Sequence, residues 1–182
     1  TKIAFTDGDD AITIADGGGV TFGATTALGA APGGAGSCTS IVNRITGATD
    51  NTATSVFTVT VPNAAHTAGI FLQIIGGTSD NESVMSANSN IAVARNSGAA
   101  AVAAVVNMSG FSIMGGTGAV IGSGEATQGL AVTVTSMSGG TSATQTFDIQ
   151  VAVNTASGST ADVTVRADLL NNEASGITIA AA

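Results

Sequence analysis

Three carboxylates within four residues, Asp7, Asp9 and Asp10, form the densest group of potential metal ligands in the sequence. Calcium binds about six to eight oxygen atoms, largely from carboxylates in loops. An EF-hand loop that began at Asp7 needs an oxygen-bearing side chain at its fifth position and glycine at its sixth, but Ala11 and Ile12 stand there. We therefore expect solvated acidic residues in a turn and no bound metal.

A second acidic loop, with Asp80, Asn81 and Glu82, offers further oxygen atoms for calcium. It lies between two apolar segments and contains Gly and Ser neighbours, a composition typical of turns. We expect solvated turn residues here as well.

The run Gly17, Gly18 and Gly19 raises the question of a phosphate-binding loop. A dinucleotide fingerprint needs a third glycine where Phe22 stands, followed by a helix. The only lysine is Lys2, so a Walker A motif is absent. We interpret the glycines as a hairpin turn that joins the segments AITIA and VTFG.

Cys38 and His66 are the only cysteine and histidine. A structural zinc site needs more such ligands than the chain has. The two could form a thiol–imidazole pair, but no family signature surrounds Cys38, and no G-x-S-x-G nucleophile motif occurs. We expect a small buried thiol at Cys38, a polar turn residue at His66, no catalytic residues, no cofactor and hence no enzyme.

Alternation of apolar and polar residues is the dominant pattern along the chain. It predicts half-buried antiparallel strands, and turn-forming Gly, Asn and Ser separate the strands at spacings near ten residues. We therefore predict an all-β fold, an antiparallel, jelly-roll-like β-sandwich. The Ala-rich segment at 99–106 lacks a helical stripe and is also predicted as strand. The clearest alternating segments are TSVFTVTVP, LAVTVT, TFDIQVAV and ADVTVRADLL.

The segment GIFLQIIG differs because it is apolar on both faces. Such a strand lies in the centre of a sandwich or covers a subunit contact. We predict a subunit interface built from Ile70, Phe71, Leu72, Ile74 and Ile75.

Residues 24–37 contain four glycines, one proline and no charge, which predicts a flexible linker or long loop. We therefore divide the chain into an N-terminal arm at 1–36 and a β-sandwich domain at 37–182. The arm carries short β-forming segments that we expect to dock on a partner by strand addition. Its predicted docking residues are Ile3, Phe5, Ile12, Ile14, Val20 and Phe22.

Composition excludes several classes of partner. Gly, Ala, Ser and Thr make up more than half of the 182 residues, and the formal net charge is −8 from twelve acidic and four basic residues. The basic residues are scattered, so we expect no nucleic acid and no membrane as partner. Few large side chains limit the core of one chain, which favours a homo-oligomer.

The second half of the chain resembles a known group of proteins. The run AGIFLQIIGGTSDNESVMSANSNIAVARNSGAAAVAAV is followed by TFDIQVAVNTASGSTADVTVRADLLNNEASGITIA. Together, over about 68–180, they resemble small Ala/Gly/Thr-rich virion structural proteins of tailed bacteriophages, especially those of cyanobacteria and aquatic bacteria.

The resemblance implies a capsid decoration (cement) protein on the outer capsid surface of the virion, commonly a trimer, which bridges major capsid subunits or other virion subunits. It also implies an alternative, a tail-fibre or adhesin-type β-module that binds the host. The acidic charge agrees with a position outside the shell, away from packaged DNA.

Overall fold

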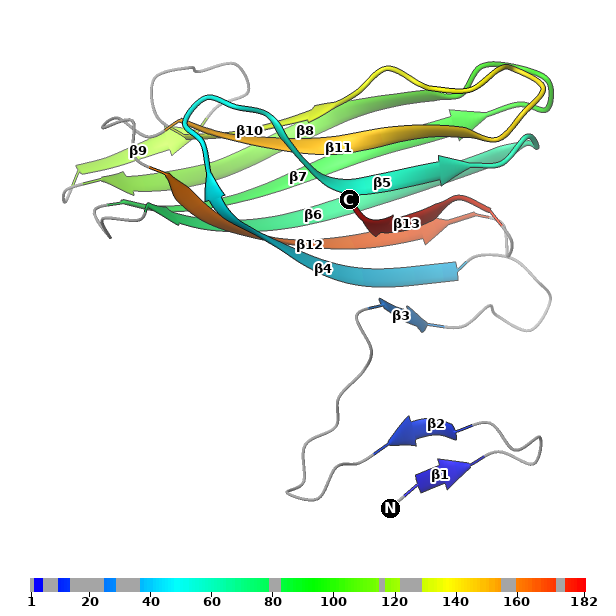
Figure 1. The fold of residues 1–182 in the computed structure, drawn as a ribbon, viewed down its shortest axis with the longest axis horizontal. Coiled ribbons are helices and arrows are strands. Elements are labelled where there is room, and N and C mark those ends of the chain that lie inside the picture. Colours follow the sequence, from blue (N-terminus) through cyan, green and yellow to red (C-terminus); the bar gives the residue numbers. More distant parts are fainter. Residues whose placement is uncertain are drawn as a thin grey trace.

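The computed structural model of the chain consists of β-strands joined by turns (Figure 1). It describes residues 2–4, 10–13, 25–28, 37–78, 83–114, 117–121, 129–154, 160–172 and 176–182. Within these ranges no helix is long and apolar enough to span a membrane. The predicted all-β class and antiparallel sandwich are confirmed.

The larger sheet has seven strands, and all neighbours in it are antiparallel. The segment GIFLQIIG lies in its central strand, one of the two positions that its apolar character predicted. In spatial order the strands are β3 (Thr25–Leu28), β4 (Ser37–Ala48), β12 (Ala161–Asn171), β6 (His66–Thr78), β7 (Ser83–Arg95), β8 (Val102–Met114) and β9 (Thr117–Ile121).

The smaller sheet has four antiparallel strands, and a third sheet has two. The four-stranded sheet has the order β10 (Gly129–Val134), β11 (Gln145–Asn154), β5 (Thr54–Val61) and β13 (Thr178–Ala181). The two-stranded sheet pairs β1 (Lys2–Ala4) with β2 (Asp10–Thr13).

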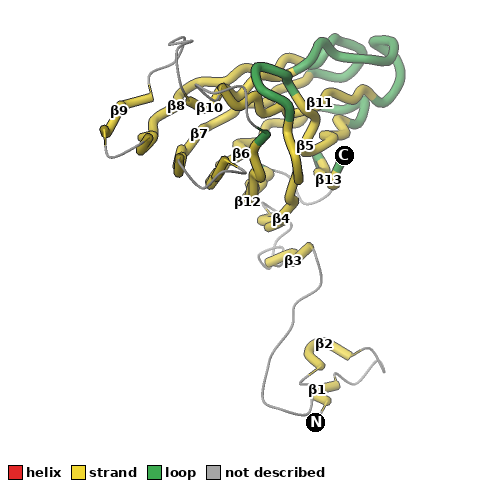
Figure 2. The backbone as a smooth tube through the Cα atoms, turned by 60° about the vertical axis from the view of Figure 1, so that its left-hand side comes forward, coloured by secondary structure: helices red, strands yellow, loops and turns green. Residues whose placement is uncertain are grey.

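The core lies between the seven- and four-stranded sheets, which form two layers (Figures 1 and 2). β12 shows why the sequence builds it: alternate residues of this strand are buried, and the residues between them face solvent or lie at the surface. A period of two places every second side chain on one face of a strand. The large, fully buried side chains include Phe57, Phe147, Ile70, Leu72, Ile91, Ile149 and Leu169.

Two sequence predictions are refined by the fold. The segment at 99–106 enters β8 at Val102, whereas Ala99–Ala101 precede the strand. The segment at 24–37, expected as linker, includes β3, and Thr25–Leu28 pair with Cys38–Ile41 of β4. The division at 36 and 37 and the proposed VTFG hairpin stay predictions, because residues 14–24 and 29–36 lie outside the described ranges.

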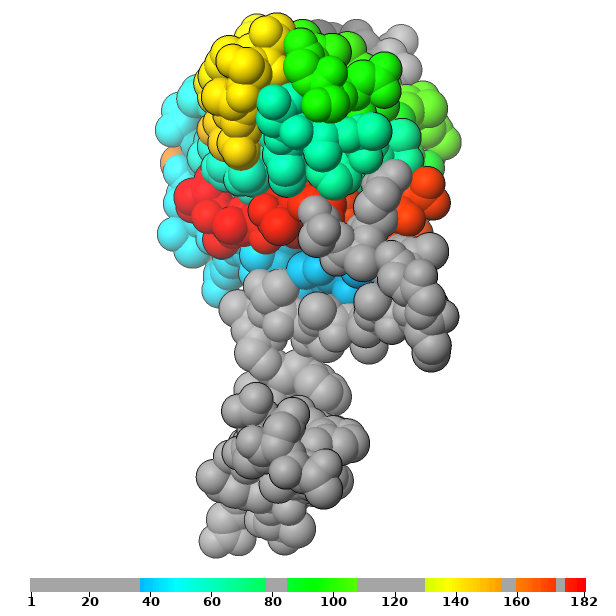
Figure 3. Space-filling model, turned by 90° about the vertical axis from the view of Figure 1, so that its right-hand side faces the viewer, coloured from blue at the N-terminus to red at the C-terminus, as the bar shows by residue number. Residues whose placement is uncertain are grey.

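Arg95 at the end of β7 joins two loops and the end of β5 at one end of the sandwich. Its side chain is only 4% exposed. Nε donates to the carbonyl oxygen of Ala99 (3.0 Å), Nη1 to that of Val61 (2.8 Å), and Nη2 to those of Thr141 (2.8 Å) and Ala143 (2.7 Å). The segments that supply these carbonyls pack side by side in teal, green and yellow (Figure 3). A buried guanidinium thus satisfies carbonyls of two loops and of the last residue of β5.

Gly139, in the loop drawn in yellow in Figure 3, has a backbone conformation that only glycine adopts readily. Its φ is +95°, and a Cβ atom there would lie 2.6 Å from the carbonyl oxygen of Thr144. Gln145 depends on this conformation, because its Nε2 donates to the Gly139 carbonyl (2.9 Å) while its Oε1 accepts from the Ala101 amide (2.7 Å). The two loops at this end are therefore coupled through Gln145.

Gly139→Ala is expected to lower the free energy of unfolding by about 1–3 kcal/mol, because strain and a backbone clash act together. Gly140→Ala is the matched control: its Cβ would meet no atom within 4 Å, so a change within about 0.5 kcal/mol is expected. Urea unfolding followed by far-ultraviolet circular dichroism measures both. Equal effects of the two substitutions would contradict the role of the Gly139 conformation.

Candidate functional site

The face of the seven-stranded sheet that points away from the four-stranded sheet carries exposed side chains of varied chemistry. We call it the outer face. Four neighbouring strands, β4, β12, β6 and β7, supply it, because the residues between their buried positions point outward. Its members are Val42, Arg44, Asp162, Thr164, Arg166, Asp168, Leu170, Phe71, Gln73, Ile75, Ser86, Asn88 and Asn90.

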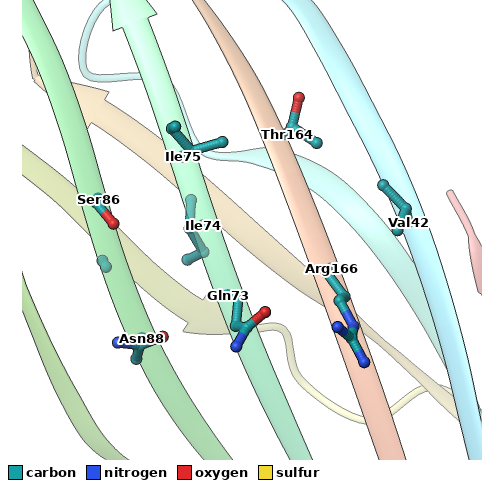
Figure 4. A pocket seen from close by; sticks show the side chains of 9 residues that line it. Val42, Gln73, Ile74, Ile75, Ser86, Asn88, Thr164 and Arg166 are labelled. Carbon is teal, nitrogen blue, oxygen red and sulfur yellow. The ribbon is translucent and has the colours of Figure 1, made fainter.

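One polar row crosses the outer face at right angles to the strands. The register pairs Arg166 with Val42 on one side and with Gln73 on the other, and it pairs Gln73 with Asn88. These residues line a shallow depression of about 440 Å³, in which side chains from four strands lie next to one another (Figure 4). The row offers a guanidinium and two amides as hydrogen-bonding groups.

The next row along the strands also combines one apolar side chain with polar ones. Thr164 pairs with Arg44 and with Ile75, and Ile75 pairs with Ser86. Ile75 and Thr164 line both the first depression and a second one of about 320 Å³, which reaches Arg44 and Asp162. The two depressions therefore form one continuous shallow surface along β6 and β12, with apolar carbon between polar groups.

Arg166 is held in place by its own strand and by β4. Its Nε and Nη2 donate to Oδ1 of Asp168 at 3.2 and 3.0 Å, and Nη2 also donates to Oγ of Ser40 at 3.4 Å. Ser40 in turn donates to Oδ1 of Asp168. The guanidinium is about half exposed, so these contacts orient it more than they stabilise the fold.

Asp162 marks the other end of the outer face. Its Oδ2 accepts from Nη2 of Arg44 (2.8 Å) and its Oδ1 from the amide of Gly47 (2.9 Å). The Gly47 amide and, after it, the Arg44 side chain hold the pKa of this carboxyl below its ordinary value of 3.8, against a small opposing effect of desolvation. Gly47 can present its amide this way because its φ is +64°.

We expect Arg44→Ala to raise the pKa of Asp162 and yet leave it below 3.8, since the larger influence, the Gly47 amide, remains. A folded pKa below the unfolded one means that the stabilisation is present above the unfolded value and is lost as the pH falls through the folded value. Carboxyl chemical shifts followed by NMR between neutral and acid pH measure it, with Arg166→Ala as the control. A pKa at or above 3.8 in Arg44→Ala would contradict the role of Gly47.

The five residues of the predicted interface fall on two faces of β6. Ile70, Leu72 and Ile74 are at most 2% exposed and belong to the core of this chain. Phe71 and Ile75 are 44% and 56% exposed and belong to the outer face. Only the latter two are therefore available to a partner.

The predicted docking arm is described in part. Ile3 lies in β1 and Ile12 in β2, and the register pairs these two residues with each other. Phe5, Ile14, Val20 and Phe22 lie outside the described residues.

Within the described ranges, the residues considered for catalysis or metal binding do not come together. Register places Cys38 opposite Leu170 on the outer face, whereas His66 is buried on the other face of the sheet and opens β6 instead of lying in a turn. Cys38 is half-buried. Over the described ranges no three His, Cys, Asp or Glu side chains cluster as for a metal. Asp10 opens β2, and the acidic loop 80–82 and Asp7 and Asp9 lie outside these ranges.

Sequence reasoning missed the row formed by Arg166, Gln73 and Asn88. Alternation in ADVTVRADLL does indicate that Arg166 points outward. Nothing in the sequence shows that a strand nearly a hundred residues earlier in the chain lies beside it in this register. Alternation along a strand therefore indicates that a residue points outward, but no local pattern indicates that the three residues form a row.

Comparison with known proteins gives similarity of fold only. No protein-family model and no curated protein sequence matches the chain. Among solved structures, the tailspike protein gp49 of Acinetobacter baumannii bacteriophage Fri1, a capsular polysaccharide depolymerase, matches 89% of this chain at 13% identity with a TM-score of 0.48. The tailspike of Acinetobacter baumannii phage AM24 matches 79% at 13% identity with a TM-score of 0.42. The chain covers 22% and 28% of those two proteins.

The expectation that the chain is not an enzyme is corrected at this point. The finding against it is that the Fri1 tailspike, of which this chain covers 22%, is a capsular polysaccharide depolymerase. The absence of a recognisable catalytic motif from a sequence does not by itself exclude an activity, because a fold hosts many functions and its sites are not marked by one set of motifs.

Proposed function

We propose that the chain is a β-sandwich module of a tailed-bacteriophage virion, of the tail-fibre or adhesin type that binds the host. The virion setting comes from the resemblance of residues 68–180 to phage structural proteins. The single observation that supports a binding role is the outer face, which exposes apolar side chains and hydrogen-bonding groups together. Exposed apolar surface of this kind marks contact sites in soluble proteins.

The outer face is suited to contact because it is rigid and continuous. It is one side of a sheet whose other side is packed in the core, so its strands keep a fixed spacing. Ile75 and Val42 provide apolar contact at exposed fractions above one half, and Gln73 and Asn88 provide amides beside them. Recognition surfaces combine such apolar anchors with a small number of polar groups that determine orientation.

Capsid decoration, with the major capsid protein as partner, is the competing position within the virion. Both solved structures named above are tailspike proteins, and the tail is the position to test first. The experiment is immunogold electron microscopy of purified phage particles with antibodies raised against the chain, together with adsorption assays in the presence of their Fab fragments.

Label at the tail and Fab fragments that block adsorption to host cells are the expected results. Label spread evenly over the head would reject the tail position in favour of capsid decoration. Particles without label would reject the virion assignment altogether.

A further inference from the structure

We infer that the outer face packs against the same face of a second copy of this chain. The inference goes beyond the proposed function, since it concerns the purified chain and holds wherever the protein acts. It begins from four large apolar side chains that this face leaves in solvent. Val42 is 54% exposed, Phe71 44%, Ile75 56% and Leu170 45%.

The distribution of charge favours a second copy of the chain as the partner. Arg44, Asp162, Arg166 and Asp168 on the outer face sum to zero, while the whole chain carries −8. Two copies that approach through any strongly acidic surface repel each other, whereas the outer face brings no net charge. Of the four basic residues, Arg95 is buried and Lys2 lies in β1. The exposed arginines of the sandwich therefore lie on this face, where they can bind an acidic partner such as a second copy.

The order of side chains along β12 makes the face complementary to itself. Asp162, Thr164 and Arg166 point outward at equal spacing, with Thr164 in the middle. If two copies meet face to face about a two-fold axis that lies in the contact plane above Thr164, perpendicular to β12, each Arg166 lies opposite Asp162 of the other copy. A two-fold contact repeats every interaction, so this arrangement forms two intermolecular ion pairs. Ile75 and Arg44, both in register with Thr164, then meet their counterparts of the second copy, and each Arg44 keeps its ion pair with Asp162 of its own chain.

The internal contacts of these groups leave room for the intermolecular ones. Arg166 uses Nε and Nη2 within the chain, and its Nη1 donates to no acceptor among the described residues. Each carboxylate oxygen of Asp162 accepts one hydrogen bond, from Arg44 or from Gly47, and an ionised carboxylate oxygen accepts two. Each group is thus oriented by its own chain while it retains capacity for a partner.

Charge reversal with mixing tests the arrangement. In Asp162→Arg the two-fold contact opposes arginines, and in Arg166→Asp it opposes aspartates, so each variant alone is expected to associate at least tenfold more weakly than the wild type. In an equimolar mixture, both ion pairs form between unlike chains, and association should return. Sedimentation equilibrium of the full-length chains measures all three samples, and circular dichroism checks that each variant is folded.

Asp50→Arg, a charge reversal away from the outer face, is the matched control and should associate as the wild type does. Ile75→Glu, which places a carboxylate at the centre of the contact, should weaken association and should not be rescued by either charge variant. A wild type that stays monomeric at its highest soluble concentration would overturn the inference. So would folded charge variants that still associate, including as trimers, or a mixture that fails to recover.

Discussion

Arg95→Ala is expected to lower the free energy of unfolding by about 3–5 kcal/mol, since several buried acceptors lose their donor at once, and this is a large part of the stability of an ordinary domain. The substitution removes four hydrogen bonds from a guanidinium that is 4% exposed. It leaves carbonyl oxygens of two loops and of Val61 at the end of β5 without their donor, and buried acceptors that lose a partner keep the full cost of desolvation.

Arg95→Lys separates the charge from the geometry. An ammonium group keeps the charge but cannot reach acceptors on several sides with a planar fork, so less than half of the loss is expected to be recovered. Arg166→Ala is the matched control, because its guanidinium is about half exposed, and a loss below about 1 kcal/mol is expected.

Urea unfolding followed by far-ultraviolet circular dichroism is the suitable measurement for these variants, since the chain contains no Trp and no Tyr for fluorescence. A loss for Arg95→Ala no greater than that for Arg166→Ala would show that the loops are held by other contacts.

Phe57→Ala is expected to cost about 3–5 kcal/mol, the range for a buried phenylalanine that leaves a cavity. Phe57 is fully buried in the four-stranded sheet, where its register partner is Ile149. The chain contains only six Phe and no other aromatic residue, so the small side chains around such a site have few atoms with which to fill the space.

Phe71→Ala is the matched control, with the same change of side chain in the other sheet. Phe71 is 44% exposed on the outer face, so a loss below about 1.5 kcal/mol is expected in the isolated chain, in proportion to the smaller apolar area removed from water. Equal losses at both positions under dilute conditions would contradict the assignment of Phe57 to the core and of Phe71 to the surface.

Much of the strand content could be predicted from the sequence because alternation is a local property. In β12 the inward set Val163, Val165, Ala167 and Leu169 is buried as the pattern predicted. The central position of GIFLQIIG was also indicated, since a strand apolar on both faces belongs inside a sheet. The pattern failed where a local signal was weak: β3 lies in a Gly- and Ala-rich segment whose composition is typical of a linker.

The candidate site was harder to predict, because it depends on which strands lie side by side. The predicted interface named five apolar residues of β6, yet three of them belong to the core. Period two divides a strand into two faces, but it does not say which face the second sheet will cover. The row of Arg166, Gln73 and Asn88 likewise exists only through the register between β12, β6 and β7.

By itself, then, the sequence determined that this chain forms strands, where many of them lie and which of their residues share a face, because these properties depend on neighbours along the chain. The tertiary structure decided which face became the outer face, which polar side chains meet on it, and that Arg95 is buried between two loops and the end of β5. Those outcomes depend on contacts between segments far apart in the sequence, such as Arg95 with Thr141 and Arg44 with Asp162, and no local pattern encodes them.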